Sequence, residues 1–171
     1  GFNQSRGFRV RSGDVLVDHD IRSHAVSISA DSGNLTVTGR INAAGKTGGS
    51  ISLAAHGNLT IASGAELLVT ASSFNSAGKG GSIVLEAGTQ RDGVAYSGAL
   101  LDLQSGARID LSVLDYVAGS YSTPGSSAFE GKFTGTLHLR APRTTTNDGL
   151  GISSLQSTIT GASAVIAEGF K

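Results

Sequence analysis

Residues 48–55 read Gly48-Gly49-Ser50-Ile51-Ser52-Leu53-Ala54-Ala55, and residues 80–87 repeat them as Gly80-Gly81-Ser82-Ile83-Val84-Leu85-Glu86-Ala87. A looser copy, Gly135-Thr136-Leu137-His138-Leu139-Arg140-Ala141, occurs further along the chain. In each copy apolar residues alternate with small or polar ones, which is typical of a strand with one buried face. A unit of this size cannot bury its apolar face alone, so its repetition predicts that the copies stack.

Two further short strands follow each long one. A glycine-marked turn opens the second strand, in Gly13-Asp14-Val15-Leu16-Val17, Gly33-Asn34-Leu35-Thr36-Val37 and Gly57-Asn58-Leu59-Thr60-Ile61. The third strand carries Ile41, then Leu67 and Val69, then Ile109, Leu111 and Val113. Apolar residues at period two on three successive strands predict an all-β parallel β-helix, a solenoid of about five coils that begin near residues 7, 25, 48, 80 and 133.

Composition limits the function classes. The 171 residues include 25 Gly but only two Pro and no Cys, Met or Trp, so the core is built from Val, Ile, Leu and Ala without disulfides. Thirteen basic and thirteen acidic residues balance without long runs, which disfavours a nucleic-acid partner. No apolar run approaches the roughly 20 residues that span a bilayer, so we expect no membrane insertion.

Surplus residues must leave the solenoid as projecting loops, because the expected coils differ in length. Three candidates are residues 72–79, residues 90–98 and a long insertion at 115–132. Loops that project from a solenoid are common binding sites, and exposed aromatic rings can stack on sugars or pack on proteins. The candidate ligand-binding residues are therefore Tyr96, Tyr116, Tyr121 and Phe129. The alternative is that these aromatic rings fold back over a sheet and form no site.

Charged residues recur just before the third strand of each repeat. Asp20, Arg40, Glu66 and Arg108 occupy equivalent outward positions in the predicted register. Stacked coils would bring them into an alternating-sign ladder, in which each exposed pair contributes only about 0–1 kcal/mol. Unrelated solvated charges are the alternative.

Other polar clusters do not predict chemistry. Asp18-His19-Asp20, with His24 nearby, is rich in ligand-type side chains, but adjacent strand residues point to opposite sides, so we expect a solvated bend and no metal site. Asn34-Leu35-Thr36 and Asn58-Leu59-Thr60 match a glycosylation acceptor, but both belong to the repeated turn and are interpreted as structural. We expect no cofactor and no catalytic residue.

An enzymatic alternative remains, because β-helices also carry polysaccharide lyases and hydrolases. Asp102, Asp110 and Asp115 are the carboxylates that would form an acidic face beside Arg108. The predicted register places Asp102 and Asp110 on different strands, so these two carboxylates should not converge.

Residues 78–87, the turns at 33–36 and 57–60, and residues 105–110 resemble the repeats of filamentous haemagglutinin-like large exoproteins. The resemblance covers residues 25–113 well and the remainder weakly. It implies a right-handed β-helix from a secreted bacterial surface adhesin, exported by an outer-membrane transporter of the two-partner type. The implied role is attachment to a glycan or protein on a host or bacterial surface, or formation of the fibre shaft. We expect one β-helix domain over residues 1–171, a piece of a longer chain, with a non-binding structural spacer as the alternative.

Overall fold

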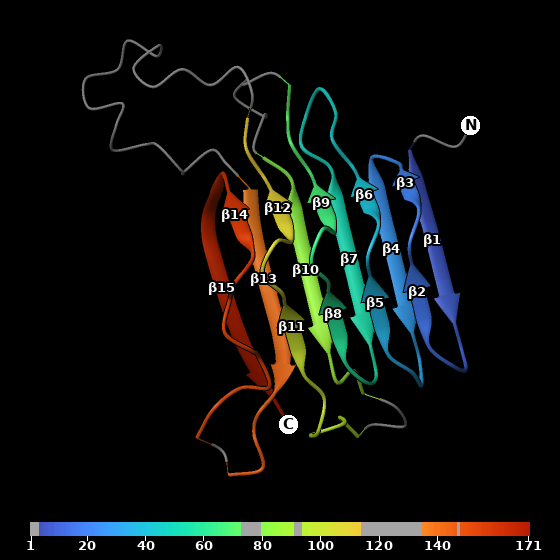
Figure 1. The fold of residues 1–171 in the computed structure, drawn as a ribbon, viewed down its shortest axis with the longest axis vertical. Helices are drawn as coiled ribbons and strands as arrows, with labels where there is room; N and C mark the ends of the chain where they lie inside the picture. The colour runs from blue at the N-terminus through green and yellow to red at the C-terminus, as the bar shows by residue number, and fades with distance from the viewer. Residues whose placement is uncertain (1–3, 73–79, 91–93, 114–134, 147) are drawn as a thin grey trace, which may run out of the picture.

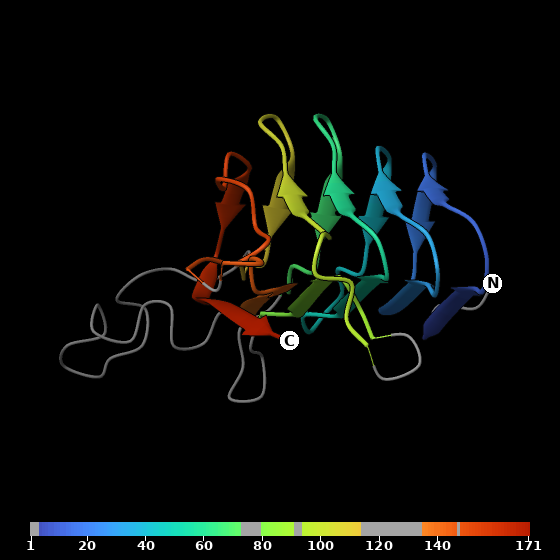
Figure 2. The ribbon, with the colours of Figure 1, turned by 90° about the horizontal axis from the view of Figure 1, so that it is seen from below.

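A computed structural model describes residues 4–72, 80–90, 94–113, 135–146 and 148–171, and these residues form strands and no helix (Figure 1). The strands assemble into three sheets, and every pairing of the named strands is parallel. Figure 2 shows the repeats side by side in chain order, from blue to red. The architecture is all-β and consistent with the predicted parallel β-helix.

The largest sheet collects the long strand of each repeat. Its order is β1-β4-β7-β10-β13-β15, so strands that are neighbours in space come from successive repeats. The strand bounds are β1 Ser5–Val10, β4 Ala25–Ala30, β7 Ser50–Ala55, β10 Ser82–Ala87, β13 Gly135–Pro142 and β15 Ala162–Phe170.

Two smaller sheets collect the short strands. The four-stranded sheet has the order β11-β8-β5-β2 and the five-stranded sheet has the order β14-β12-β9-β6-β3. The second strands are β2 Val15–Val17, β5 Leu35–Val37, β8 Leu59–Ile61 and β11 Leu101–Leu103. The third strands are β3 Asp20–Arg22, β6 Arg40–Asn42, β9 Glu66–Leu68, β12 Arg108–Asp110 and β14 Thr158–Thr160.

The repeated phrase sets the stacking register. Ile51 pairs with Ile83 and Leu53 pairs with Leu85, as the two copies of the phrase predict. Because side chains on a strand alternate between faces, the residues of like position form columns on the inner face. Leu53, Ile83 and Leu85 have no exposed surface, and Ile51 is 1% exposed. The predicted third-strand residues follow the same rule and are all buried: Ile41, Leu67, Val69, Ile109, Leu111 and Val113.

The predicted alignment of the charged residues before the third strands is confirmed. Arg40 pairs with Asp20 and Glu66, and Glu66 pairs with Arg108. Arg40 Nε lies 3.2 Å from Glu66 Oε2, and Arg108 Nη1 lies 3.5 Å from Glu66 Oε1. These side chains are 35–48% exposed, so each pair contributes little to stability beyond fixing the alignment of the third strands.

The carboxyl-terminal part of the fold was not foreseen. Strands β14 and β15 lack the repeated phrase, and the pairing of β13 with β15 shifts register between Gly135 and Thr136. Ile152 adds an isolated parallel bridge to Leu101 and so continues the four-stranded sheet without forming a named strand. Sequence comparison with the earlier repeats could not predict these pairings, because the apolar pattern here is irregular: Val165 and Ile166 are each 47% exposed.

The predicted insertion at 115–132 lies outside the residues that the structure describes. The described chain includes no helix long and apolar enough to cross a bilayer.

Replacing Leu53 with Ala is expected to lower the free energy of unfolding by about 2–5 kcal/mol, because it leaves a cavity in a filled column. Urea denaturation of the purified chain measures this value. Ser52→Ala is the matched control on the exposed face of the same strand, with an expected change below about 0.5 kcal/mol. Equal effects of the two substitutions would contradict the stacked core.

Candidate functional site

Tyr96 belongs to the described chain, whereas the other predicted ligand-binding residues, Tyr116, Tyr121 and Phe129, lie outside it. The backbone of Tyr96 is held on both sides, since its N–H donates to Gly88 O at 3.4 Å and its carbonyl accepts from Ala99 N at 3.0 Å. Its ring is 5.7 Å from the His56 ring between centroids, at an interplanar angle of 31°. The ring is thus supported on one side while the residue is 51% exposed.

His56 follows β7 directly and supports the Tyr96 ring from the neighbouring repeat. Its Nδ1 lies 2.7 Å from the carbonyl oxygen of Thr89, which can only accept, so Nδ1 carries the proton. The hydrogen bond fixes the orientation of the imidazole. In the neutral ring Nε2 is then a hydrogen-bond acceptor.

A ladder of polar side chains runs along the turns that precede the second strands. Asp14 Oδ1 accepts from the backbone N–H of Asn34 at 2.8 Å and from its Nδ2 at 3.0 Å. Asn34 Oδ1 accepts from Asn58 N at 2.9 Å, and Asn58 Oδ1 accepts from Leu100 N at 2.9 Å. Both asparagines therefore serve the turn, as the sequence predicted.

Asp14, Asn34, His56 and Tyr96 line an open groove of about 300 Å³ beside the turns that precede the second strands. We call it the Tyr96 groove; its lining residues are Asp14, Ser32, Gly33, Asn34, His56, Gly57 and Tyr96. The sequence predicted Tyr96 but missed Asp14 and His56 as its companions. Alignment of the glycine turns could have shown that Asp14 and Asn34 hold equivalent positions in successive repeats, because the next residues, Val15 and Leu35, pair with each other.

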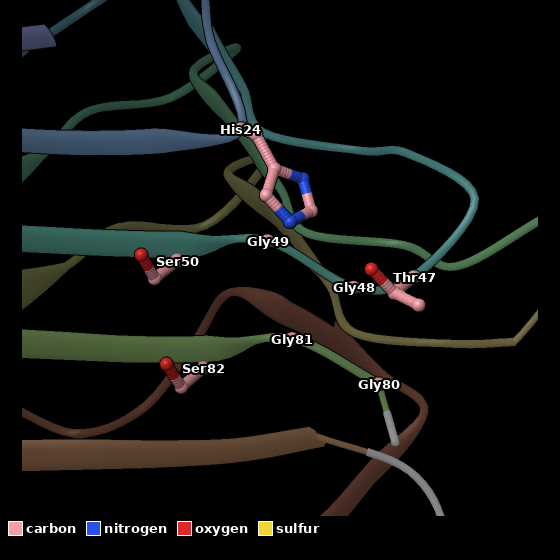
Figure 3. A pocket seen from close by; sticks show the side chains of 8 residues that line it. All are labelled: His24, Thr47, Gly48, Gly49, Ser50, Gly80, Gly81 and Ser82. Carbon is pink, nitrogen blue, oxygen red and sulfur yellow. The ribbon is translucent and has the colours of Figure 1, made fainter. Parts of the chain in front are cut away.

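A second hollow, of about 380 Å³, lies at the corner where the long strands begin (Figure 3). His24 and four glycines contribute to it, with hydroxyls from Thr47, Ser50 and Ser82. The glycines are there because the backbones of successive repeats approach closely. A Cβ on Gly81 would lie 2.3 Å from Gly49 O, and one on Gly135 would lie 1.9 Å from Gly81 O. The hollow thus reflects packing at the corner.

The Asp18 and His19 cluster faces solvent, as predicted. The two side chains are 52% and 89% exposed, and Asp18 Oδ1 lies 2.5 Å from His19 Nδ1. The hydrogen bond from His19 lowers the pKa of Asp18. His24 contributes to the hollow at the start of the long strands instead. Across the described ranges, no three His, Asp or Glu side chains come together in a way that could hold a metal ion.

The carboxylates of the enzymatic alternative are separated. Asp102 lies on β11 and Asp110 on β12, which belong to different sheets, and Asp115 is outside the described residues. Asp102 accepts hydrogen bonds from Gln104 Nε2 at 3.0 Å and Ser153 Oγ at 2.5 Å. Asp110 is 5% exposed and accepts from Arg108 Nη2 at 2.6 Å and Ser112 N at 3.0 Å. Both carboxylates therefore serve the local structure.

An ionic cluster occupies the outer face of the largest sheet. Arg140 contacts Glu86 on one side and Glu168 on the other. Its two hydrogen bonds to Glu168 run from Nε to Oε2 at 3.1 Å and from Nη2 to Oε1 at 3.2 Å. His138 points outward, as predicted, and its Nε2 lies 2.8 Å from Glu168 Oε2. Arg140 also lies over the ring of Phe170, at 5.6 Å from the centroid. The hydrogen bonds with Arg140 lower the pKa of Glu168, and those with Glu168 raise the pKa of Arg140.

No protein-family model matches the chain, no curated protein matches it, and no solved structure matches it.

Replacing Gly81 with Ala is expected to lower the free energy of unfolding by about 1–3 kcal/mol, because the added methyl group meets backbone atoms that cannot move aside easily. The Cβ would lie 2.3 Å from Gly49 O and 2.5 Å from Val69 Cβ. Gly7→Ala is the control, since nothing lies within 4 Å of a Cβ there. Urea denaturation of both variants measures the difference, and a Gly81→Ala variant as stable as Gly7→Ala would contradict the close approach.

Glu168→Gln is expected to lower the urea midpoint at pH 7, because it removes the charge that pairs with Arg140. The pKa of Glu168 is lowered in the folded chain, so its ionised form contributes stability above the pKa of the unfolded group. That contribution disappears as the pH falls through the lowered folded value. The gap between wild type and variant should therefore stay constant from neutral pH down to the unfolded pKa of about 4.3, and then narrow and close as the pH falls through the lowered folded value. A gap that persists unchanged in acid, well below the unfolded value, would contradict the assignment.

Proposed function

We propose that this chain is a right-handed parallel β-helix of about five coils in a secreted bacterial surface adhesin, where it mediates attachment or forms the fibre shaft without catalysis. The observation that carries the proposal is the in-register parallel stacking of all three sheets from repeat to repeat. Such a stack makes a stiff, extended scaffold whose length grows with the number of repeats. The resemblance of residues 25–113 to filamentous haemagglutinin-like exoproteins supports the same role.

General rules of β structure support the proposed right hand and the proposed number of coils. Crossover connections between parallel strands of one sheet are right-handed in about 98% of cases, because right-twisted strands favour that path. The passages from β1 to β4, from β4 to β7 and from β7 to β10 each join parallel strands of one sheet, so the rule applies to them. The six long strands begin successive turns, which fits about five coils between the first and the last. A crystal structure would test both features.

The partner that we propose is a glycan or protein on a host or bacterial surface, with export through a two-partner outer-membrane transporter. The exposed ring of Tyr96 favours a binding role over a non-binding spacer, because it lies in a groove with polar neighbours. The polysaccharide lyase or hydrolase alternative is disfavoured by the hydrogen bonds that occupy Asp102 and Asp110.

Latex beads coated with the purified chain are expected to bind animal or bacterial cell surfaces several-fold more than beads coated with albumin. Excess soluble chain should compete with the beads, because the same groups would be occupied. Binding no greater than that of albumin beads would contradict attachment and favour the spacer. Release of reducing or unsaturated sugar ends from polysaccharides incubated with the chain would contradict the non-catalytic assignment.

A further inference from the structure

The Tyr96 groove has an aromatic platform that is already in place. The backbone hydrogen bonds to Gly88 and from Ala99 hold Tyr96, and its ring packs against His56. The ring also covers Gly98, where a Cβ would lie 3.3 Å from Cζ. An ordered, half-exposed ring can accept a ligand with little loss of conformational freedom. Its negative π face attracts the weakly positive C–H groups on one side of a sugar ring.

Two acceptors stand beside this platform. Asp14 uses Oδ1 for both bonds from Asn34, and Oδ2 makes no hydrogen bond to any other described residue. The bond from His56 Nδ1 to Thr89 O leaves Nε2 of the neutral imidazole as an acceptor. Sugar hydroxyls are donors, and hydrogen bonds to a carboxylate are stronger than those to neutral acceptors. An aromatic face flanked by a carboxylate therefore matches the two-sided chemistry of a pyranose.

The charge and size of the groove narrow the ligand class. Among the described residues, its lining contains the carboxylate of Asp14 and no Lys or Arg, which disfavours sugar acids, phosphates and sulfates. A volume of about 300 Å³ lies at the lower end of small-molecule sites, which fits one ring better than several. The open groove permits the rest of a glycan to extend into solvent.

We propose that the Tyr96 groove binds one uncharged pyranose unit of a surface glycan, stacked on Tyr96 and hydrogen-bonded to Asp14 and His56. This inference rests on the proposed adhesin function and gives its ligand class. One ring and two hydrogen bonds give weak affinity, and many chains displayed on one surface would compensate through avidity.

Saturation-transfer NMR tests the inference with four probes: methyl β-galactoside, methyl α-mannoside, methyl N-acetyl-β-glucosaminide and methyl β-glucuronide. At least one uncharged glycoside is expected to bind, with the strongest transfer to C–H protons on one ring face, and the glucuronide to bind more weakly. Tyr96→Ala should weaken binding about tenfold or more, whereas Tyr96→Phe should keep most of it. Val94→Ala is the matched control, because Val94 is exposed on the same segment but does not line the groove.

Asp14→Asn separates the role of charge from that of shape. An asparagine keeps an Oδ1 acceptor for Asn34, so the turn should remain intact. We expect binding of the uncharged glycoside to fall several-fold and the discrimination against the glucuronide to disappear. An unchanged preference in this variant would overturn the assigned role of Asp14.

The inference fails if no uncharged glycoside binds to the folded chain, or if Tyr96→Ala and Val94→Ala bind it equally well. Circular dichroism and thermal unfolding establish that each variant is folded. Bead attachment that persists in Tyr96→Ala would leave the adhesin proposal standing and overturn the glycan groove. Loss of attachment to a purely proteinaceous surface on Tyr96→Ala would likewise overturn the glycan assignment, since that surface offers no sugar.

Discussion

Stacking of like side chains across parallel strands is the interaction on which this molecule depends. A single repeat is too thin to exclude water from its own apolar face. Ile28, Leu53 and Leu85 lie at equivalent positions of successive repeats, and each is buried because it stacks on its counterpart in the next repeat. Backbone hydrogen bonds between repeats fix the spacing at about 4.8 Å, and the side chains of a column must share that spacing. Small and medium aliphatic residues satisfy it, which explains a core without tryptophan or methionine.

The turns between the stacked strands have a different requirement, because the chain must change direction there while successive repeats remain in contact. Glycines at the start of the long strands allow backbones to approach more closely than a Cβ permits. At the turns before the second strands, Asp14, Asn34 and Asn58 instead satisfy the backbone N–H groups of the next repeat. The polar ladder leaves a carboxylate, Asp14, in the groove that His56 and Tyr96 also line.

Regular parts of the fold were predictable and irregular parts were not. The pairing of Ile51 with Ile83 and the ladder of Arg40, Glu66 and Arg108 follow from alignment of repeated phrases, because stacking converts sequence register directly into spatial register. Strand β15 does not repeat the phrase, and its pairing includes a shift that no alternation pattern encodes. Tyr96 was identified from the sequence as a loop aromatic, but its ring contact with His56 joins two repeats and could not be predicted from either one.

By itself, the sequence determined the parallel stack, the buried columns and the sites where the chain turns. These features are local or repeat at near-constant intervals, so pattern and composition specify them. Only the tertiary structure decided which side chains share a groove. Asp14, His56 and Tyr96 come from three different repeats, and they line one groove because the repeats stack and the backbone of Tyr96 is held by Gly88 and Ala99. That geometry depends on many weak contacts at once, and no short stretch of sequence contains it.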